Sequence, residues 1–263
     1  MATVNDILTY IHTLAPTEMK EHWDHVGLNC GHLDQEVKTV LVALDPFSAV
    51  CQEALAENVD LLVTHHALIW TPGFVTDGNE WGRNTLLLIE NNIACINAHT
   101  NLDCAPGGVN DILAVKLGLS EIQVIDPRGV DVQGRPWGLL RQGLVTEQPL
   151  EVFLRTVKAS LGCEGLRYVS GGRPVQRVAV GGGACAGEMA AALRAGCDTF
   201  VTSDVRYNQF WDAQSLGLNL IDAGHFHTEN PVVAYLAEKL QAAFPEIVVK
   251  LSQCHKDCAK FYQ

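Results

Sequence analysis

Two adjacent histidines end an apolar run of the sequence, Asp60-Leu-Leu-Val-Thr-His-His66. The run is typical of a buried strand, and strand side chains alternate between faces, so His65 and His66 can reach one site only where the strand ends. Imidazole nitrogens are ligands for Zn, Fe, Mn and Ni. Because ligands bind beyond the carboxyl ends of strands in an open α/β sheet, the pair predicts a metal site there.

Further residues of metal-binding type follow apolar runs elsewhere. They lie in Asn97-Ala-His-Thr-Asn-Leu-Asp103 and in Asp222-Ala-Gly-His-Phe-His-Thr-Glu229. A lone buried histidine is more often a hydrogen-bonded core residue, but several such groups at strand ends favour a metal site. Three histidines with two carboxylates are enough for two divalent ions if a carboxylate bridges them. The predicted ligands are His65, His66, Asp103, His225 and Glu229.

Three more polar residues are candidates for orienting these ligands or moving protons. His99 and His227 are second histidines in the same two segments, and a role as a loop cap is the equal alternative for His99. Asp204 ends Thr202-Ser-Asp204, where it either faces the metals as an acid or base or caps a helix over 205–216.

Two other motifs are better explained as structure. Trp23-Asp-His-Val-Gly-Leu28 has apolar residues that would pack and an aspartate, Asp24, that would cap. Gly181-Gly-Gly-Ala184 lies between a strand and a helix, where backbone N–H groups can hold a phosphate. It matches neither G-x-G-x-x-G nor a Walker motif, so a tight turn is the expected role.

Alternating strands and helices must position the predicted ligands. Asp45 and Pro46 predict the cap and the first position of the second helix. A loop over 67–81, directly after the paired histidines, has a length that is often functional. Helices are predicted over 4–14, 46–58, 82–91 and 108–117, and strands over 38–44, 60–65 and 93–98.

The opening pattern of the chain returns in its second half. Residues 176–202 repeat the strand-helix-strand unit of residues 38–64 without a gap, so that Val201-Thr-Ser-Asp204 aligns with Val63-Thr-His-His66. We infer an internal duplication. The predicted fold is α/β, with two similar three-layer lobes and a metal cleft between them.

The expected domains are a first lobe over 1–127, a second lobe over 128–253 and a C-terminal tail over 254–263. The boundary is expected among a cluster of Pro and Gly turns. A helix over 230–243 and a strand over 246–251 are expected to close the second lobe.

The composition limits partners and compartment. The 263 residues carry a formal net charge of −12, which disfavours nucleic acid and anionic membranes. No apolar stretch approaches the roughly 18 residues of a membrane span, and the start lacks a secretory signal. Nine scattered cysteines suggest reduced thiols, so we expect a cytoplasmic protein. Cys254-His-Lys-Asp-Cys258 is expected to be an exposed tail.

Over residues 4–251 the sequence resembles the GTP cyclohydrolase I type 2 homologue family, also called the NGG-interacting-factor-three-like family. The motifs that carry the resemblance are Trp23-Asp-x-Val-Gly-Leu28, Thr64-His-His66, His99-Thr-Asn-Leu-Asp103, Gly107-Gly-Val-Asn-Asp111 and Asp222-Ala-Gly-His-x-x-Thr-Glu229.

The resemblance implies a two-lobed α/β fold with a dinuclear metal centre at the lobe interface, and a toroidal homohexamer whose sites face an internal cavity. The family's metal ligands correspond to the five residues predicted above, with Asp103 or Glu229 as the bridging carboxylate. Some members are credited with hydrolytic opening of the GTP ring.

The sequence departs from the family pattern at three positions. Ala67 replaces the usual Pro or Gly after the paired histidines, Ser203 stands where a Gly normally precedes Asp204, and Asn208 replaces a frequent His. None is a predicted ligand, so the departures bear on the substrate rather than on the metals. The chain also lacks the domain that longer members insert between the lobes.

The leading hypothesis from the sequence is a metal-dependent hydrolase. Water activated by the ions would attack an amidine-like carbon or a phosphoester of a small-molecule substrate, for which a nucleotide is one candidate. The competing hypothesis is a non-catalytic metal-binding, metal-delivery or scaffold protein. A catalytic site keeps water on the metals, whereas a structural site is closed by protein ligands.

Overall fold

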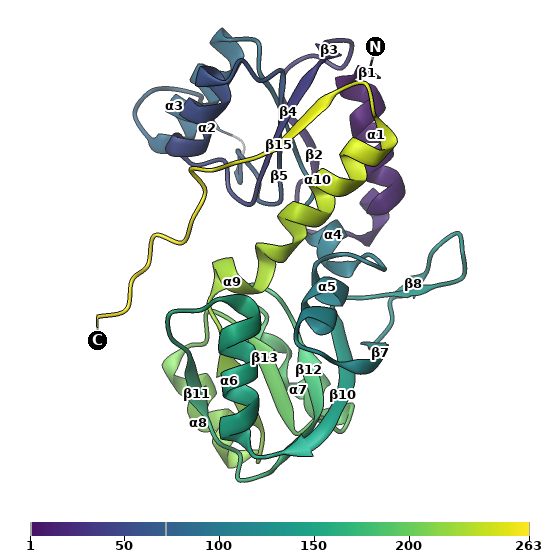
Figure 1. Cartoon of the computed structure of the whole chain (residues 1–263), viewed down its shortest axis with the longest axis vertical. Helices are drawn as coiled ribbons and strands as arrows, with labels where there is room; N and C mark the ends of the chain where they lie inside the picture. The colour runs from purple at the N-terminus through teal and green to yellow at the C-terminus, as the bar shows by residue number, and fades with distance from the viewer. Residues whose placement is uncertain (1, 72, 263) are drawn as a thin grey trace. The chain divides into compact units, whose positions relative to one another are not determined.

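The structure of the protein is a computed structural model that describes residues 2–71 and 73–262 (Figure 1). Pro72, in the loop predicted over 67–81, lies outside the described residues. Among the described residues, no helix combines the length and the apolar character that a membrane span requires.

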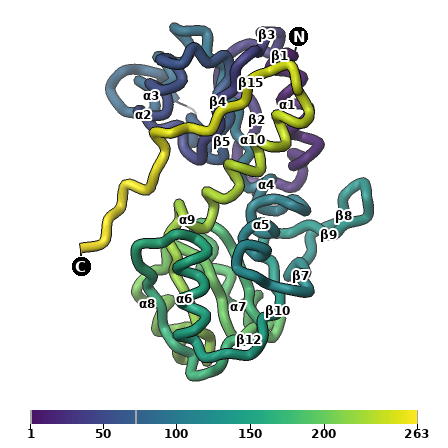
Figure 2. The backbone as a smooth tube through the Cα atoms, viewed as in Figure 1, coloured from purple at the N-terminus to yellow at the C-terminus, as the bar shows by residue number. Residues whose placement is uncertain are grey.

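The chain is divided into two compact units, each built from a long and a short stretch of sequence. Unit 1 consists of Met1–Leu102 and Val232–Lys256, and unit 2 consists of Asp103–Pro231 and Asp257–Gln263. The tube in Figure 2 lets the reader follow each stretch by its colour. This division differs from the expected one in two ways. The first stretch of unit 1 ends at Leu102 instead of residue 127, and Val232–Lys256 belongs with the beginning of the chain.

Unit 1 contains a five-stranded sheet with the order β15-β4-β5-β6-β2. The first four strands are parallel neighbours, and β2 pairs antiparallel with β6. β4, β5 and β6 are almost entirely buried, as parallel strands covered on both faces are. The strands are β2 (Gly27–Cys30), β4 (Thr39–Ala43), β5 (Leu61–Thr64), β6 (Ala94–Asn97) and β15 (Val248–Leu251).

Helices cover both faces of this sheet. α2 and α3 lie together on one face (Figure 1), where Leu41 and Leu62 of the strands pack with Leu88 of α3. α1 and α10 lie on the other face, and the N-cap residue of α1 is Thr3, whose side chain forms a capping box with Asp6. The helices are α1 (Val4–Leu14), α2 (Ser48–Ala56), α3 (Glu80–Glu90) and α10 (Pro231–Ala243).

Unit 2 contains a six-stranded sheet with the order β11-β14-β13-β12-β10-β7. β12, β13 and β14 are parallel, and the outer strands pair antiparallel with them or with each other. The strands are β7 (Ser120–Ile125), β10 (Leu140–Gln148), β11 (Arg167–Val169), β12 (Val175–Val180), β13 (Thr199–Thr202) and β14 (Asn219–Asp222).

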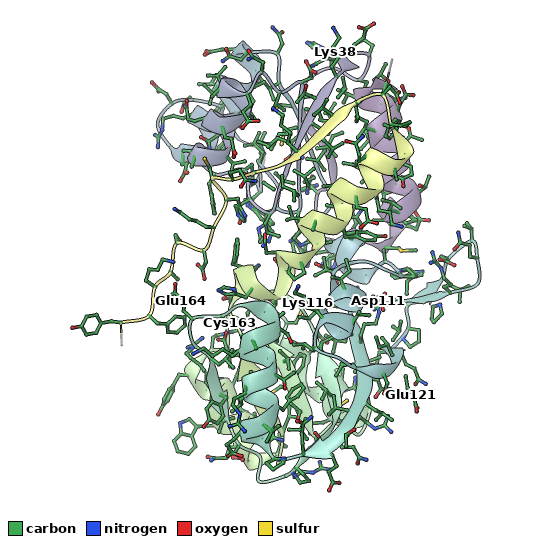
Figure 3. The ribbon with its side chains drawn as sticks, viewed as in Figure 1. Lys38, Asp111, Lys116, Glu121, Cys163 and Glu164 are labelled. Carbon is green, nitrogen blue, oxygen red and sulfur yellow. The ribbon has the colours of Figure 1, made fainter. Side chains whose placement is uncertain are left out.

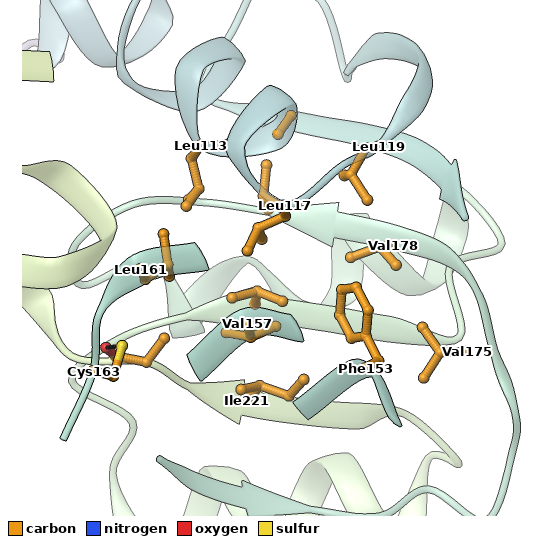
Figure 4. Close-up of a cluster of buried hydrophobic side chains, with 14 of the residues drawn as sticks. Leu113, Leu117, Leu119, Phe153, Val157, Leu161, Cys163, Val175, Val178 and Ile221 are labelled. Atoms are coloured by element: carbon orange, nitrogen blue, oxygen red, sulfur yellow. Dashed lines mark hydrogen bonds between the residues drawn. The ribbon is translucent and has the colours of Figure 1, made fainter. Parts of the chain in front are cut away.

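The second sheet is also covered on both faces. α5 and α6 pack on one face, where Phe153 and Val157 of α6 contact a cluster that includes Val178 and Ile221 of the strands (Figure 4). α7 and α8 pack on the other face around Phe200. The helices of unit 2 are α5 (Val109–Lys116), α6 (Leu150–Leu161), α7 (Met189–Arg194), α8 (Tyr207–Ser215) and α9 (His225–Glu229). α4 (Thr100–Cys104) contains the point in the chain, after Leu102, where unit 1 ends and unit 2 begins.

Short elements complete the two units. In unit 1, β1 pairs with β3, and in unit 2, β8 pairs with β9. These elements are β1 (Ala2–Thr3), β3 (Glu36–Val37), β8 (Gly129–Val130), β9 (Pro136–Trp137) and the 3₁₀ turns η1 (Thr17–Met19) and η2 (Ala186–Glu188).

The two sheets share one order of elements. A helix, an antiparallel edge strand and a parallel β-α-β-α-β run follow each other as α1-β2-β4-α2-β5-α3-β6 and as α6-β11-β12-α7-β13-α8-β14. The Asp60 carboxylate accepts hydrogen bonds from the backbone N–H groups of Lys38 and Thr39, and the Asp198 carboxylate does the same at the start of β12. This shared detail supports the inferred duplication.

The structure corrects two expectations from the sequence. The strand at the C-terminal end, β15, does not close the second lobe, because it extends the first sheet as a parallel neighbour of β4. Asp45 does not cap the second helix: Phe47 is the N-cap residue, and the Asp45 carboxylate contacts the side chains of His66 and His255 instead.

Candidate metal centre

The paired histidines lie directly after β5, as predicted. His65 is fully buried, and its Nδ1 contacts the backbone oxygen of Ala98 at 2.8 Å. Because a carbonyl oxygen only accepts, Nδ1 must carry the proton, and Nε2 then presents its lone pair to a ligand or an ion. The His65 ring is therefore fixed in the tautomer that a metal site needs.

A carboxylate fixes the second histidine of the pair. The Nδ1 atom of His66 lies 2.5 Å from Oδ1 of Asp45, and Nε2 of His255 lies 2.8 Å from Oδ2 of the same carboxylate. Burial by itself would raise the pKa of Asp45, but the hydrogen bonds from the two histidines outweigh it and hold this pKa well below its ordinary range. Asp45 is thus a carboxylate at neutral pH.

A third histidine of unit 1 joins the pair. The Nδ1 atom of His99 lies 2.9 Å from Oδ2 of Asp24, which also accepts hydrogen bonds from the backbone and hydroxyl of Thr100. Burial alone would raise the pKa of Asp24, but the hydrogen bonds from His99 and Thr100 hold it well below its ordinary range. Asp24 therefore orients a histidine and, as a cap, accepts the hydrogen bonds of Thr100 at the start of α4 (Thr100–Cys104).

The three histidines form a compact cluster in unit 1. One possible ligand atom each from His65, His66 and His99 lies within 4.8 Å of the others. The indole of Trp70 lies 5.0 Å from the His99 ring and 5.9 Å from the His66 ring, measured between centroids. Three imidazoles at this separation have the donor type and spacing of a divalent-metal site.

Unit 2 carries its own donors on the short helix α9. His225 and Glu229 are separated by one helical turn, and His225 Nε2 lies 3.0 Å from Glu229 Oε2. The other ring nitrogen of His225, Nδ1, lies 2.7 Å from Oδ2 of Asp204. Asp204 thus orients His225, and the alternative that it caps α8 is wrong because Arg206 is the N-cap residue there.

Asp103, the remaining predicted ligand, lies on α4 and is 6% exposed. A carboxylate oxygen of Asp103 lies within 4.8 Å of one of Glu229. The segment after Asp103 is anchored by the buried Arg141, which donates to the backbone oxygens of Cys104 and Ala105 and to the carboxylate of Asp111, labelled on α5 in Figure 3. Two carboxylates so close together in a buried region favour a bound cation.

The glycine turn between β12 and α7 makes room for Glu229. A Cβ atom added at Gly183 would lie 2.1 Å from Oε1 of Glu229, and Gly183 has a φ of +62°. The N–H of Gly182 donates to Asn110, and the N–H of Gly183 donates to Thr228. The turn is therefore tight as expected, and these two N–H groups hold the fold rather than a phosphate.

His227 faces away from the other predicted residues of α9. Its Nδ1 contacts the backbone oxygen of Leu161 at 3.3 Å, and its Nε2 lies 3.3 Å from a carboxylate oxygen of Asp257. The structure thus brings His99 and Asp204 to candidate ligands, whereas it places His227 against α6 and the end of the chain.

Two residues that the sequence did not single out belong to the candidate site. Asp45 follows the end of β4, and a carboxylate at a strand end indicates a candidate site residue. Because Asp45 also precedes a proline, the sequence predicts a helix cap at this position instead. His255 had no such signal, because it lies in the C-terminal segment expected to be exposed. Its neighbours Cys254 and Cys258 are exposed, but only 5% of the His255 side chain is accessible.

Known proteins share both the sequence and the fold. The sequence profile of the Duf34/NIF3 (NGG1p interacting factor 3) family matches residues 2–258. A GTP cyclohydrolase 1 type 2 homolog of Clostridium perfringens is 33% identical over 243 residues, covering 90% of this chain and 91% of that protein. One of Streptomyces coelicolor is 37% identical over 240 residues, covering 88% of this chain and 83% of that protein.

Solved structures agree with these matches. A Bacillus cereus protein related to NIF3 has a TM-score of 0.93 at 25% identity, covering 100% of this chain and 99% of that one. Reduced HcgD from Methanocaldococcus jannaschii has a TM-score of 0.79 at 27% identity, covering 96% and 98% of the two chains. Because profile, relatives and solved structures each match almost the whole chain, the protein belongs to the Duf34/NIF3 family.

Proposed function

We propose that the protein is a metal-dependent hydrolase that acts on a small substrate, with nucleotides and phosphoesters as the first candidates. Its two divalent ions, of Zn, Fe, Mn or Ni type, would be bound by His65, His66, Asp103, His225 and Glu229. The names of the relatives as GTP cyclohydrolase 1 type 2 homologs support a hydrolytic reaction on a nucleotide.

The observation that carries this proposal is the anchoring of each histidine ligand at Nδ1. His65 is anchored by Ala98, His66 by Asp45 and His225 by Asp204. Metal-binding histidines almost always have such a partner, which orients the ring and raises the basicity of the ligating nitrogen. Divalent ions bound there would lower the pKa of water and polarise the substrate.

The protein's own residues would manage the proton and orient the ligands. With Nδ1 of His99 held by Asp24, Nε2 of His99 is the atom that would accept the proton released when water adds to the substrate. Asp204 would act through His225 as a positioning residue. His227 would brace α9, because its ring nitrogens contact Leu161 and Asp257.

One observation favours the non-catalytic alternative. His65 is fully buried and Glu229 is 3% exposed, and a metal site closed by protein ligands cannot turn over a substrate. In that case the protein would bind or deliver metal. Both functions require the same metal ligands, so metal binding does not distinguish them. A measurement of substrate turnover does.

Metal analysis and a substrate screen test the proposal. The purified chain should contain about two divalent ions, as a bridged site requires. Glu229→Gln should lose metal while its circular dichroism spectrum stays that of the wild type. A screen of nucleotides and phosphoesters should then find activity in the wild type that His65→Ala lacks. His32→Ala, which changes an exposed histidine of unit 1, is the matched control.

Equal turnover by the wild type and His65→Ala would refute the hydrolase. Metal binding without turnover of any compound would support the alternative. Assembly into a toroidal homohexamer is a separate proposal that rests on the family resemblance, and sedimentation velocity of the metal-loaded protein tests it.

A further inference from the structure

Unit 1 contains a cavity of about 220 Å³ beside the histidine cluster. Its walls come from the β4–α2 turn, from the segment that follows β5 and from the start of α3. α2 and α3 lie side by side in Figure 1, so the cavity is formed by neighbouring elements of one unit. The volume is sufficient for a flat ring or a short conjugated group, not for a whole nucleotide.

Aromatic side chains form the apolar walls of this cavity. Phe47, Trp70 and Trp81 line it, and the first two are 55% and 51% exposed. Large aromatic side chains that are this exposed to solvent beside a cavity favour a flat ligand that stacks on them. Because Trp70 also contacts the rings of His66 and His99, a ligand stacked on it would lie next to the candidate metal ligands.

The polar edge of the cavity carries negative charge and acceptor oxygens. Oε1 of Glu80 accepts hydrogen bonds from the backbone N–H and the hydroxyl of Ser48, which fixes this carboxylate at the rim. Asn84 is 5% exposed, and its Nδ2 donates to the backbone oxygen of Pro46. The Asp45 carboxylate adds a second negative charge, and no Lys or Arg is among the described residues that line the cavity.

We propose that this cavity binds a planar, N–H-rich group of the amidine or guanidine type, stacked between aromatic rings and hydrogen-bonded to Glu80. A flat cation gains from the faces of the tryptophans and from the carboxylate together. A phosphate or carboxylate group would meet the carboxylates of Glu80 and Asp45, with no Lys or Arg among the described lining residues, so we expect the anionic part of a substrate to lie elsewhere. The inference rests on the proposed function only in treating the occupant as a substrate.

Benzamidine is the probe for this site, with benzoate as the anion of nearly the same shape. The metal-free full-length chain is labelled with 5-fluorotryptophan, and each probe is titrated by fluorine NMR, with signals assigned by Trp→Phe variants. We expect benzamidine to shift the signals of Trp70 and Trp81, and not that of Trp211 on α8. Its affinity should exceed that of benzoate at least tenfold.

Glu80→Gln keeps an oxygen that accepts from Ser48 but removes the charge, and it should weaken benzamidine binding about tenfold. Glu90→Gln, a charge change at the other end of α3, should leave the affinity unchanged. Equal affinity for benzoate and benzamidine, or equal affinities in the two variants, would overturn the proposal. Metal content measured on the same protein before the metal is removed reports separately on the proposed function.

Discussion

At the scale of single residues, the recurring feature is an aspartate carboxylate that contacts Nδ1 of a histidine and leaves Nε2 to face the candidate metal site. Asp24, Asp45 and Asp204 each hold one ring by its Nδ1. The histidines could be predicted from the sequence because they follow apolar runs. Asp45 was not predicted as a site residue, because an aspartate before a proline equally predicts a helix cap, and its partners lie 21 and 210 residues away.

Replacing Asp204 with Asn tests this orienting role. Asn tolerates the left-handed backbone at position 204, where φ is +51°, so the fold should be kept. The loss of the carboxylate behind His225 should weaken metal binding about 10- to 100-fold. The dissociation constant is measured by competition with a metal-binding dye.

The matched control for this substitution is Asp126→Asn. Asp126 is also an aspartate of unit 2 with a positive φ, +48°, but it is exposed and pairs with Arg194. Its substitution should leave the metal affinity unchanged, because an exposed ion pair contributes little to the fold. A similar loss in both variants would argue against a specific role of Asp204.

Gly183 gives a second prediction at this scale. In Gly183→Ala the new methyl group would overlap Oε1 of Glu229 at 2.1 Å, so Glu229 must move and the bound metal should be lost. The left-handed φ should cost a further 1–2 kcal/mol or so of unfolding free energy. Metal analysis and urea unfolding measure the two effects.

Gly172→Ala separates these effects. Gly172 also has a positive φ, +75°, but a Cβ there would meet nothing within 4 Å. It should show the cost of about 1–2 kcal/mol for the backbone and keep its metal. If Gly183→Ala also keeps its metal, the turn does not position Glu229 as inferred.

At the scale of elements, the sequence predicted which segments form helices and strands better than it predicted their neighbours. Apolar periodicity predicted α1 and the strands that precede the histidines, and these are confirmed. It could not predict α9, whose five residues are too few to show a helical period. It also could not predict the partner of β15, because a strand pattern does not say which sheet edge it joins.

The C-terminal segment after β15 has a pH-dependent attachment. The Glu53 carboxylate on α2 accepts hydrogen bonds from Ser252, Gln253 and Cys254. Burial alone would raise the pKa of Glu53, but these hydrogen bonds lower it below its usual 4.5. Because the pKa of Glu53 is lower in the folded chain than in the unfolded chain, the stabilisation is complete above the usual pKa of 4.5 and is lost as the pH falls through the folded-state pKa.

We therefore expect the amides of Gln253 and Cys254 to be protected from hydrogen exchange at neutral pH and to lose protection as the pH falls below 4.5. Exchange rates corrected for the intrinsic effect of pH measure this. Glu53→Gln should lower the protection and remove its pH dependence, whereas Glu238→Gln on α10 should change neither. Protection that stays constant down to pH 3 in the wild type would contradict the attachment.

At the scale of the whole molecule, the α/β class predicted from the sequence is confirmed, because alternating strand and helix patterns allow few other arrangements. The lobe boundary predicted near residue 127 was placed by Pro and Gly turns, whereas the division in the structure follows packing. Residues such as Leu236 and Leu240 of α10 are buried in unit 1. The apolar pattern of this helix predicts that one face is buried, but it does not predict which unit the helix packs against.

The long stretch that separates the two parts of unit 1 has a consequence for synthesis. When Val232–Lys256 leaves the ribosome, every strand of the second sheet has already been made, whereas the first sheet still lacks β15. Until then the outer edge of β4 exposes backbone groups that a foreign strand can pair with. We therefore expect the second sheet to have all its strands before the first sheet does, and the nascent chain to be most vulnerable to misassembly before β15 is made.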